Sequence, residues 1–184
     1  MTGVQTCALP ISALFQPFAS SERTIRWCAR EGVTPVLPQM REDLQRQLFE
    51  IMVEESAAAG RPLKYGENMG LLRDVIVAGS DAEARALWAD SGAFIGASWF
   101  APFGFGEVLK DLKTGAAPDS DALLERGLAL VGTVDTVCRQ LEALIKHAPN
   151  PHIFAWMYVS AVPNATMMRS IELFATKVMP RFAS

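Results

Sequence analysis

Short apolar runs alternate with amphipathic helical patterns along most of this chain, and no other feature constrains its fold as much. Four strand-like runs stand near residues 13–19, 33–37, 70–78 and 152–159. Helical patterns follow them at about 20–31 and 41–59, from residue 80, and from residue 164. Because strands that alternate with helices form a parallel sheet covered by helices, the sequence predicts an α/β fold.

The length of the chain limits how this sheet is arranged. A complete (β/α)8 barrel takes ~250 residues, and this chain has 184. Four strand–helix units therefore suit half of such a barrel. Residues 90–118, rich in glycine and aromatic residues and without a clear period, would form an insertion. An open doubly wound sheet is the competing arrangement, and the spacing of the elements does not decide between the two.

The first eleven residues differ in kind from the rest of the chain. MTGVQTCALPI resembles, residue for residue, the in-frame translation of a common sequencing-library adapter. A signal peptide would begin with basic residues, which this segment lacks, and Pro10 breaks its short apolar run. We therefore interpret residues 1–11 as non-native and residues 12–184 as the native barrel half. An adapter at this place also predicts a truncated reading frame, so we expect a fragment of a longer protein.

Composition excludes several classes of protein. The net charge is −3, and the basic residues are scattered, which gives no surface for nucleic acid. No apolar stretch reaches the ~18 residues that a membrane-spanning helix needs. Three cysteines without metal-ligand spacing and two histidines argue against a metal centre. We therefore expect a cytoplasmic protein with no nucleic-acid, membrane or metal partner.

The loops that lead from strands into helices are the candidate binding sites, because parallel α/β folds bind their ligands there. In the first such loop Ser20, Ser21 and Thr24 place three hydroxyls at a helix start. Unpaired N–H groups and the positive end of the helix dipole lie at the same place, which suits a phosphate. Serines also cap helices without binding any ligand. The residues by themselves leave both roles open.

Aromatic residues provide a second group of candidates. Trp99, Phe103 and Phe105 stand among glycines in the insertion. A glycine-hinged loop of this kind closes over a substrate and excludes water, or else packs on the end of the barrel. Trp156 and Met157, at the end of the last strand, are candidates for core packing or for the floor of a pocket.

Two segments of the chain resemble one family, the bacterial luciferase-like flavin monooxygenases. Residues 19–29 (ASSERTIRWCA), followed by a glycine and a short strand, resemble the start of the helix after the fifth barrel strand in that family. Residues 131–133 (VGT), the helix and strand after them, and residues 170–180 (SIELFATKVMP) resemble the family's closing unit. The terminal SxxLFxxxVMP pattern is the most specific part, and the resemblance spans residues 12–184.

The resemblance implies a (β/α)8 barrel with an insertion after the seventh strand, and this chain would be its C-terminal half. It implies reduced FMN and O2 as reactants, or a deazaflavin in some branches. The phosphate-binding hydroxyls of the family fall on Ser21 and Thr24, with Ser20 beside them. A flavin reductase would supply the reduced flavin, a small apolar organic compound would be the substrate, and the full-length protein would be a homodimer.

The sequence departs from the family in two respects. Luciferase itself has an acidic residue where this chain has Val159, so the light-emitting reaction is not implied. The first four strand–helix units of the family, with an active-site histidine and a phosphate-contacting arginine, have no counterpart here. We therefore assign no catalytic residue and expect the fragment to be inactive alone. A deazaflavin-dependent hydride-transfer oxidoreductase of the same fold and a non-catalytic partner subunit remain the alternatives.

Overall fold

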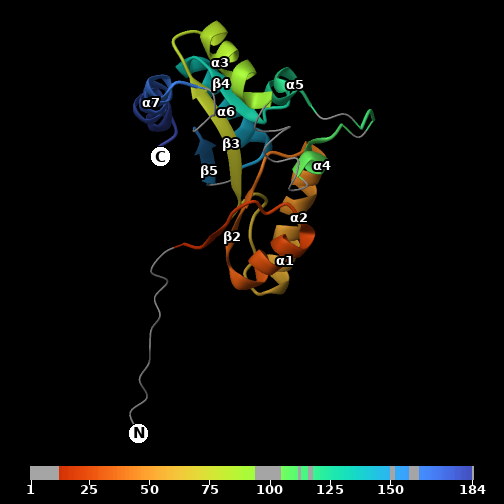
Figure 1. The fold of residues 1–184 in the computed structure, drawn as a ribbon. Helices are drawn as coiled ribbons and strands as arrows, with labels where there is room; N and C mark the ends of the chain where they lie inside the picture. Colours follow the sequence, from red (N-terminus) through yellow and green to blue (C-terminus); the bar gives the residue numbers. More distant parts are fainter. Residues whose placement is uncertain are drawn as a thin grey trace.

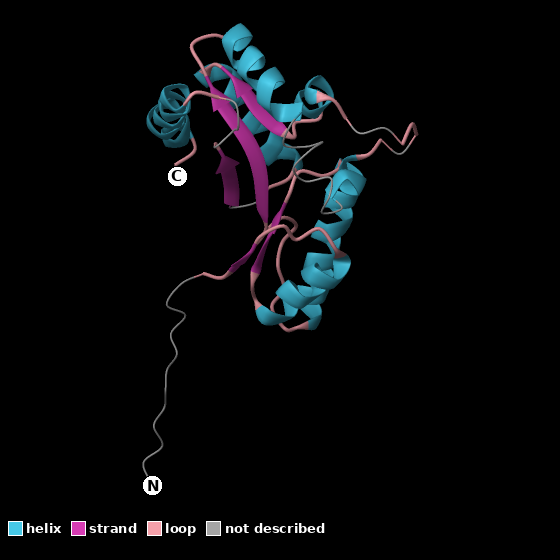
Figure 2. Ribbon diagram, viewed as in Figure 1, coloured by secondary structure: helices cyan, strands magenta, loops and turns pink. Residues whose placement is uncertain are grey.

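A computed structural model describes residues 13–93, 105–111, 113–115, 118–149, 152–157 and 162–183. Within these residues, parallel strands form a single sheet with helices packed on both of its faces (Figures 1 and 2). The strands are β1 (Phe15–Gln16), β2 (Thr34–Leu37), β3 (Gly70–Val77), β4 (Ala129–Gly132) and β5 (His152–Trp156). The predicted α/β fold with a parallel sheet is confirmed.

The helices occupy the segments between and after these strands. They are α1 (Glu22–Glu31), α2 (Glu42–Ala58), α3 (Asp81–Ala93), α4 (Phe105–Leu109), α5 (Ser120–Glu125), α6 (Val134–His147) and α7 (Asn164–Leu173). After α7 the chain continues through a π-helical turn, Phe174–Val178, and a 3₁₀ turn, Met179–Arg181. Strand β4 was not predicted, because a four-residue apolar run cannot be told from part of a buried helix by its pattern.

The longest strand, β3, lies at the centre of the sheet. Gly70 pairs with β2 and β5, and Asp74 pairs with β4 and β5. A strand has only two edges, so β5 lies on the opposite edge of β3 from β2 at Gly70 and from β4 at Asp74. Strands β2 and β4 therefore share one edge of β3, and β5 occupies the other. In a closed barrel β5 would lie beside β4. Here it pairs with β3, whose buried backbone groups would otherwise lack partners along that edge.

This strand order places α3 and α6 on opposite faces of the sheet. Trp88 of α3 packs near Ile76, whereas Val137 of α6 packs near Val75 and Val77 on the other face of β3. The chain steps from β3 to β4 in one direction and from β4 past β3 to β5 in the other. Right-handed crossovers in opposite directions put their helices on opposite faces.

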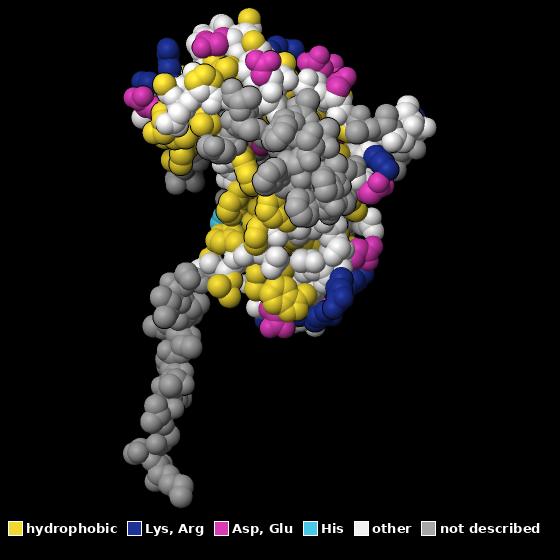
Figure 3. Space-filling view, viewed as in Figure 1, with side chains coloured by type: hydrophobic (Ala, Val, Ile, Leu, Met, Phe, Trp, Pro, Cys, Tyr) yellow, Lys and Arg dark blue, Asp and Glu magenta, His cyan; other side chains and the backbone are white. Residues whose placement is uncertain are grey.

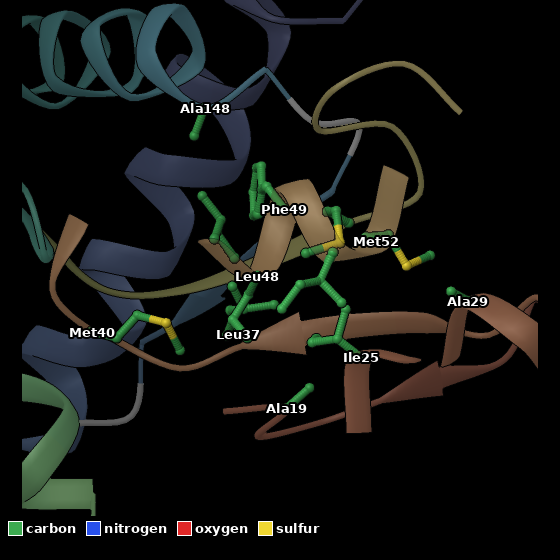
Figure 4. Packing of buried hydrophobic residues seen from close by; sticks show 12 residues of the cluster. Ala19, Ile25, Ala29, Leu37, Met40, Leu48, Phe49, Met52 and Ala148 are labelled. Carbon is green, nitrogen blue, oxygen red and sulfur yellow. The ribbon is translucent and has the colours of Figure 1, made fainter. Parts of the chain in front are cut away.

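Helices α1 and α2 cover the lower end of the sheet, where they form one hydrophobic core with β2 (Figure 4). Ile25 of α1, Leu37 of β2 and Leu48 of α2 are fully buried there. Ser21 caps the start of α1 as predicted, and Gly32, with φ of 72°, ends it. This packing fixes the direction of α1, and therefore the position of its first turn.

Cys28 and Cys138 are buried, where free cysteines behave as small hydrophobic residues. Burial raises the pKa of the Cys28 thiol to about 11, so the thiol stays protonated at neutral pH. None of the helices among the described residues has both the length and the apolar character needed to cross a bilayer.

Candidate functional site

The first turn of α1 brings two predicted site residues together. The backbone N–H of Thr24 donates to Ser21 Oγ over 3.3 Å, and the two hydroxyl oxygens lie 3.0 Å apart. Ser20, directly before the cap, is half-buried and forms no hydrogen bond with a described residue. The pair therefore offers hydroxyl donors at a helix start, where the first N–H groups lack intrahelical acceptors.

A hollow of about 730 Å³ opens beside this turn. Four of its lining residues were not predicted from the sequence: Gln16, Arg23, Trp27 and Arg30. The last three lie at helical spacing on one face of α1. Trp27 is 44% exposed on a helix whose opposite face is buried, and this exposed aromatic residue in an amphipathic helix was the usable sign of a site. The lining residues are Gln16, Ser21, Arg23, Thr24, Trp27 and Arg30.

The hollow carries positive charge. Arg23 forms no ion pair with any described residue, and Arg30 lies 3.8 Å from Glu55 Oε2, a loose contact. The described lining contains no carboxylate. Two guanidinium groups, two hydroxyls and the positive end of α1 therefore surround a space that also has an indole ring on its wall. This arrangement suits an anionic oxygen group attached to a flat ring system.

Aromatic rings from β1, β5 and the loop before α1 gather on the sheet face opposite α1 and α2. The ring of Phe15 lies 5.1 Å from His152 and 5.4 Å from Phe154, and Phe18 lies 6.2 Å from Trp156, measured between centroids. We call these five residues the aromatic face. Figure 3 shows hydrophobic side chains gathered over the middle of the molecule. Trp156, a predicted pocket residue, belongs to this face.

A buried carboxyl lies next to the aromatic face. Asp74 is paired in register with Trp156, is 5% exposed, and accepts a hydrogen bond from Gln39 Nε2 at 2.6 Å. Burial raises the pKa of Asp74 to about 7, against the opposing charge of Arg73. Such a group can hold or release a proton near neutral pH. Arg73 and Asp74 are adjacent charged residues inside the apolar run 70–78, and this sign of a site is visible in the sequence, although neither residue was predicted as a site residue.

Of the remaining predicted residues, Met157 lies on the other face of the sheet. Met157 packs against the core formed by Val75 and Val77, on the face covered by α6, because neighbouring strand residues point to opposite faces. Phe105 begins α4. Trp99 and Phe103 lie outside the described residues, so a lid over the substrate stays a prediction.

Solved structures of similar fold are known, although sequence comparisons find no relative. No family model matches the chain, and no curated protein matches it in sequence. Three solved structures that match are the oxygenating constituent of 3,6-diketocamphane monooxygenase from Pseudomonas putida, a type II Baeyer–Villiger monooxygenase in complex with FMN; the monooxygenase RslO1 from Streptomyces bottropensis; and the coenzyme F420-dependent tetrahydromethanopterin reductase from Methanopyrus kandleri.

These similarities cover nearly all of this chain and part of each neighbour. The diketocamphane enzyme gives a TM-score of 0.70 at 20% identity over 92% of this chain and 48% of its own. RslO1 gives 0.67 at 20% identity over 95% and 49%, and the reductase gives 0.57 at 14% over 92% and 50%. The chain therefore has the fold of these oxidoreductases and spans about half of their length.

Proposed function

We propose that this chain is the FMN-binding part of a luciferase-like, flavin-dependent monooxygenase. The observation that carries the proposal is the positively charged hollow at the start of α1, with its paired hydroxyls. The fold supports it, since the diketocamphane monooxygenase of similar fold was solved in complex with FMN. The donor set fits a phosphate group, which helix starts and arginines both bind.

Every lining residue of the hollow except Gln16 has a role in this proposal. The hydroxyls of Ser21 and Thr24 donate hydrogen bonds to phosphate oxygens, and the side chain of Ser20 adjoins them. Arg23, in the first turn of α1, balances the charge of the phosphate, and Arg30, in the last turn, adds positive charge at longer range. Trp27 provides a flat apolar wall beside it. No catalytic acid or base is assigned to these residues.

The reaction proposed for the whole protein is insertion of one oxygen atom from O2 into a small apolar organic substrate. Reduced flavin, when bound, supplies the electrons for this chemistry, and a separate flavin reductase renews them. The aromatic face offers an apolar surface that would orient such a substrate and exclude water. Because the chain spans about half of its neighbours' length, we propose that activity needs the rest of a longer, homodimeric protein and that this chain alone is inactive.

Comparing FMN with riboflavin tests the phosphate site, because riboflavin lacks only the phosphate. The full chain is titrated into each flavin while flavin fluorescence is followed. We expect FMN to bind more tightly, and the double variant Ser21→Ala with Thr24→Ala to lose about tenfold in FMN affinity but none in riboflavin affinity. Ser80→Ala, which removes a serine cap at the start of α3, is the matched control. Equal binding of both flavins to the unaltered chain would contradict the proposal.

A deazaflavin-dependent hydride transfer is the second candidate, and the similar fold of the coenzyme F420-dependent reductase favours it. The same titration with coenzyme F420 separates the two candidates. Tighter binding of F420 than of FMN would favour the reductase, and the reverse order would favour the monooxygenase.

A further inference from the structure

A buried arginine crosses the inside of the molecule from β3. Arg73 is 2% exposed, and its guanidinium donates three hydrogen bonds. The acceptors are Gly127 O at 3.1 Å, Leu72 O at 2.8 Å and Gln45 Oε1 at 3.0 Å. Since a guanidinium has five N–H groups, two of them have no acceptor among the described residues.

No carboxylate forms an ion pair with this guanidinium within the described parts of the chain. The neighbouring Asp74 accepts its hydrogen bond from Gln39, and as the adjacent strand residue it points to the opposite face of β3. Desolvation lowers the pKa of Arg73 to about 10, which still leaves it charged at neutral pH. The charge of Asp74 raises that pKa, but Asp74 forms no hydrogen bond with the guanidinium, so two buried N–H groups are left that a bound anion could satisfy.

Arg73 lines a cavity of about 350 Å³ between α2, α5 and α6. This volume lies within the ~300–1,000 Å³ of small-molecule pockets. Gln45 lines it too, and because Gln45 Oε1 accepts from Arg73, its amide nitrogen is left as a second donor. The cavity shares no lining residue with the hollow beside α1.

The rest of the wall is mainly apolar, with carboxylates at exposed positions. Leu124, Leu128 and Leu144 supply the apolar part. Glu42 is exposed and engaged by Arg46 at 2.9 Å, and Glu125 is exposed next to the positive Arg126. The carbonyl of Gly127 is already engaged by Arg73, so the buried end of the cavity offers the remaining N–H groups of Arg73 and Gln45. The sides are largely apolar, and Gln140 and His147 add polar groups to them.

We propose that this cavity binds a small organic carboxylate with an apolar body, and that Arg73 and Gln45 hold the carboxylate. A planar guanidinium matches the two oxygens of a carboxylate, and the bound anion supplies acceptors for the two N–H groups of Arg73 that have none. The leucine side chains contact the apolar body of the ligand. A fully hydrated inorganic anion would gain nothing from that wall, which favours an organic acid over free phosphate.

Benzoate is the probe for this site, and benzyl alcohol is its neutral match. The melting temperature of the full chain is measured against each compound, with sodium chloride added to hold the ionic strength constant. We expect a saturable rise with benzoate, and none with benzyl alcohol or inorganic phosphate. A rise no larger than that with chloride at equal ionic strength would overturn the proposal, as would an equal rise with benzyl alcohol.

Variants locate the binding. Ala143 is exposed on α6 and lines the cavity, so we expect Ala143→Phe to obstruct the cavity while Arg73 itself is unaltered. It should abolish the benzoate effect, whereas the same substitution at exposed Ala86 on α3 should leave it unchanged. Arg73→Lys keeps the charge but not the planar fork, and should weaken binding about tenfold. An undiminished benzoate effect in the Ala143→Phe variant would refute the site even if Arg73→Lys fails to fold.

Discussion

Ser170 Oγ accepts a hydrogen bond from the backbone N–H of Val77 over 2.8 Å, which ties α7 to the end of β3. Ala78 donates to Gly132 of β4, so the N–H of Val77 points to the other edge of the strand. Along that edge β5 pairs only as far as Asp74. The hydroxyl of Ser170, the serine of the SxxLFxxxVMP pattern, thus accepts a hydrogen bond that the backbone of a longer β5 would otherwise accept.

Removing this hydroxyl should destabilise the protein. Ser170 is buried, and Ser170→Ala leaves the N–H of Val77 without an acceptor, so we expect a loss of about 1–3 kcal/mol in the free energy of unfolding. Urea denaturation followed by circular dichroism measures this. Arg169→Ala, an exposed change on the same helix, should stay within about 0.5 kcal/mol. A similar loss in both variants would point to a general sensitivity of α7.

The buried Asp74 should make stability depend on pH. The pKa of Asp74 is about 7 in the folded chain, against an ordinary value of 3.8 for an aspartate. The folded state therefore binds more protons than the unfolded state between these pH values. Stability should therefore fall as the pH rises from about 4 to about 7, by at most ~1.4 kcal/mol per pH unit from this group. Asp74→Asn should flatten this slope, and Asp90→Asn, on the exposed side of α3, should not. A slope that Asp74→Asn leaves unchanged would assign the dependence to other groups.

A glycine at the end of β4 should tolerate no side chain. A Cβ on Gly132 would lie 2.5 Å from Thr136 Cγ2 and 2.7 Å from Asp81 Oδ1. The carboxylate of Asp81 accepts from Thr133 N–H at 2.7 Å and from the Thr136 hydroxyl at 3.1 Å, and these bonds hold its pKa below the usual value. Gly132→Ala would push this network apart.

We expect Gly132→Ala to cost more than Gly60→Ala, which adds a Cβ in open space at a φ of 76°. The control should lose about 1–2 kcal/mol from backbone strain alone. Chemical denaturation of the two variants compares them directly, and equal losses would show that the contacts with Thr136 and Asp81 relax without cost.

Arg23 should contribute to FMN binding through its charge. It has no ion-pair partner among the described residues, and Arg23→Met should weaken FMN binding about threefold while leaving riboflavin unchanged. The salt dependence of FMN affinity should become shallower, since an exposed charge pair is screened by salt. Arg85→Met on α3 is the matched control. An FMN affinity unaffected by Arg23→Met would leave the phosphate to the hydroxyls and Arg30.

Local chemistry made much of this fold predictable from sequence. The helical pattern from residue 80 begins at a serine that caps α3, with the N–H of Glu83 donating to Ser80 Oγ at 3.1 Å. The apolar run of β3 and the serine cap of α1 were equally visible, because they depend on neighbours in the chain. The pairing of β5 with β3 was not, because no local pattern says which buried edge a distant strand will choose.

The same difference runs through the candidate sites. Ser21 and Thr24 meet because they lie three residues apart on one helix turn. The hydrogen bond of the buried Asp74 carboxyl comes from Gln39, which lies 35 residues earlier in the loop after β2. The charge of Arg73 inside an apolar run is visible in the sequence, but the cavity beside it needs α2, α5 and α6 in place together and has no counterpart in the sequence pattern.

The place of β5 also sets an order of events in time. During synthesis β3 leaves the ribosome long before β5, and one edge of this central strand lacks its partner until residues 152–156 have been added. Ser170 comes later still. Contacts between such distant segments slow folding, because the long intervening chain must be closed first. The central strand β3 is therefore made early but gains its last partners, β5 and Ser170, late, and we expect this late pairing to slow folding.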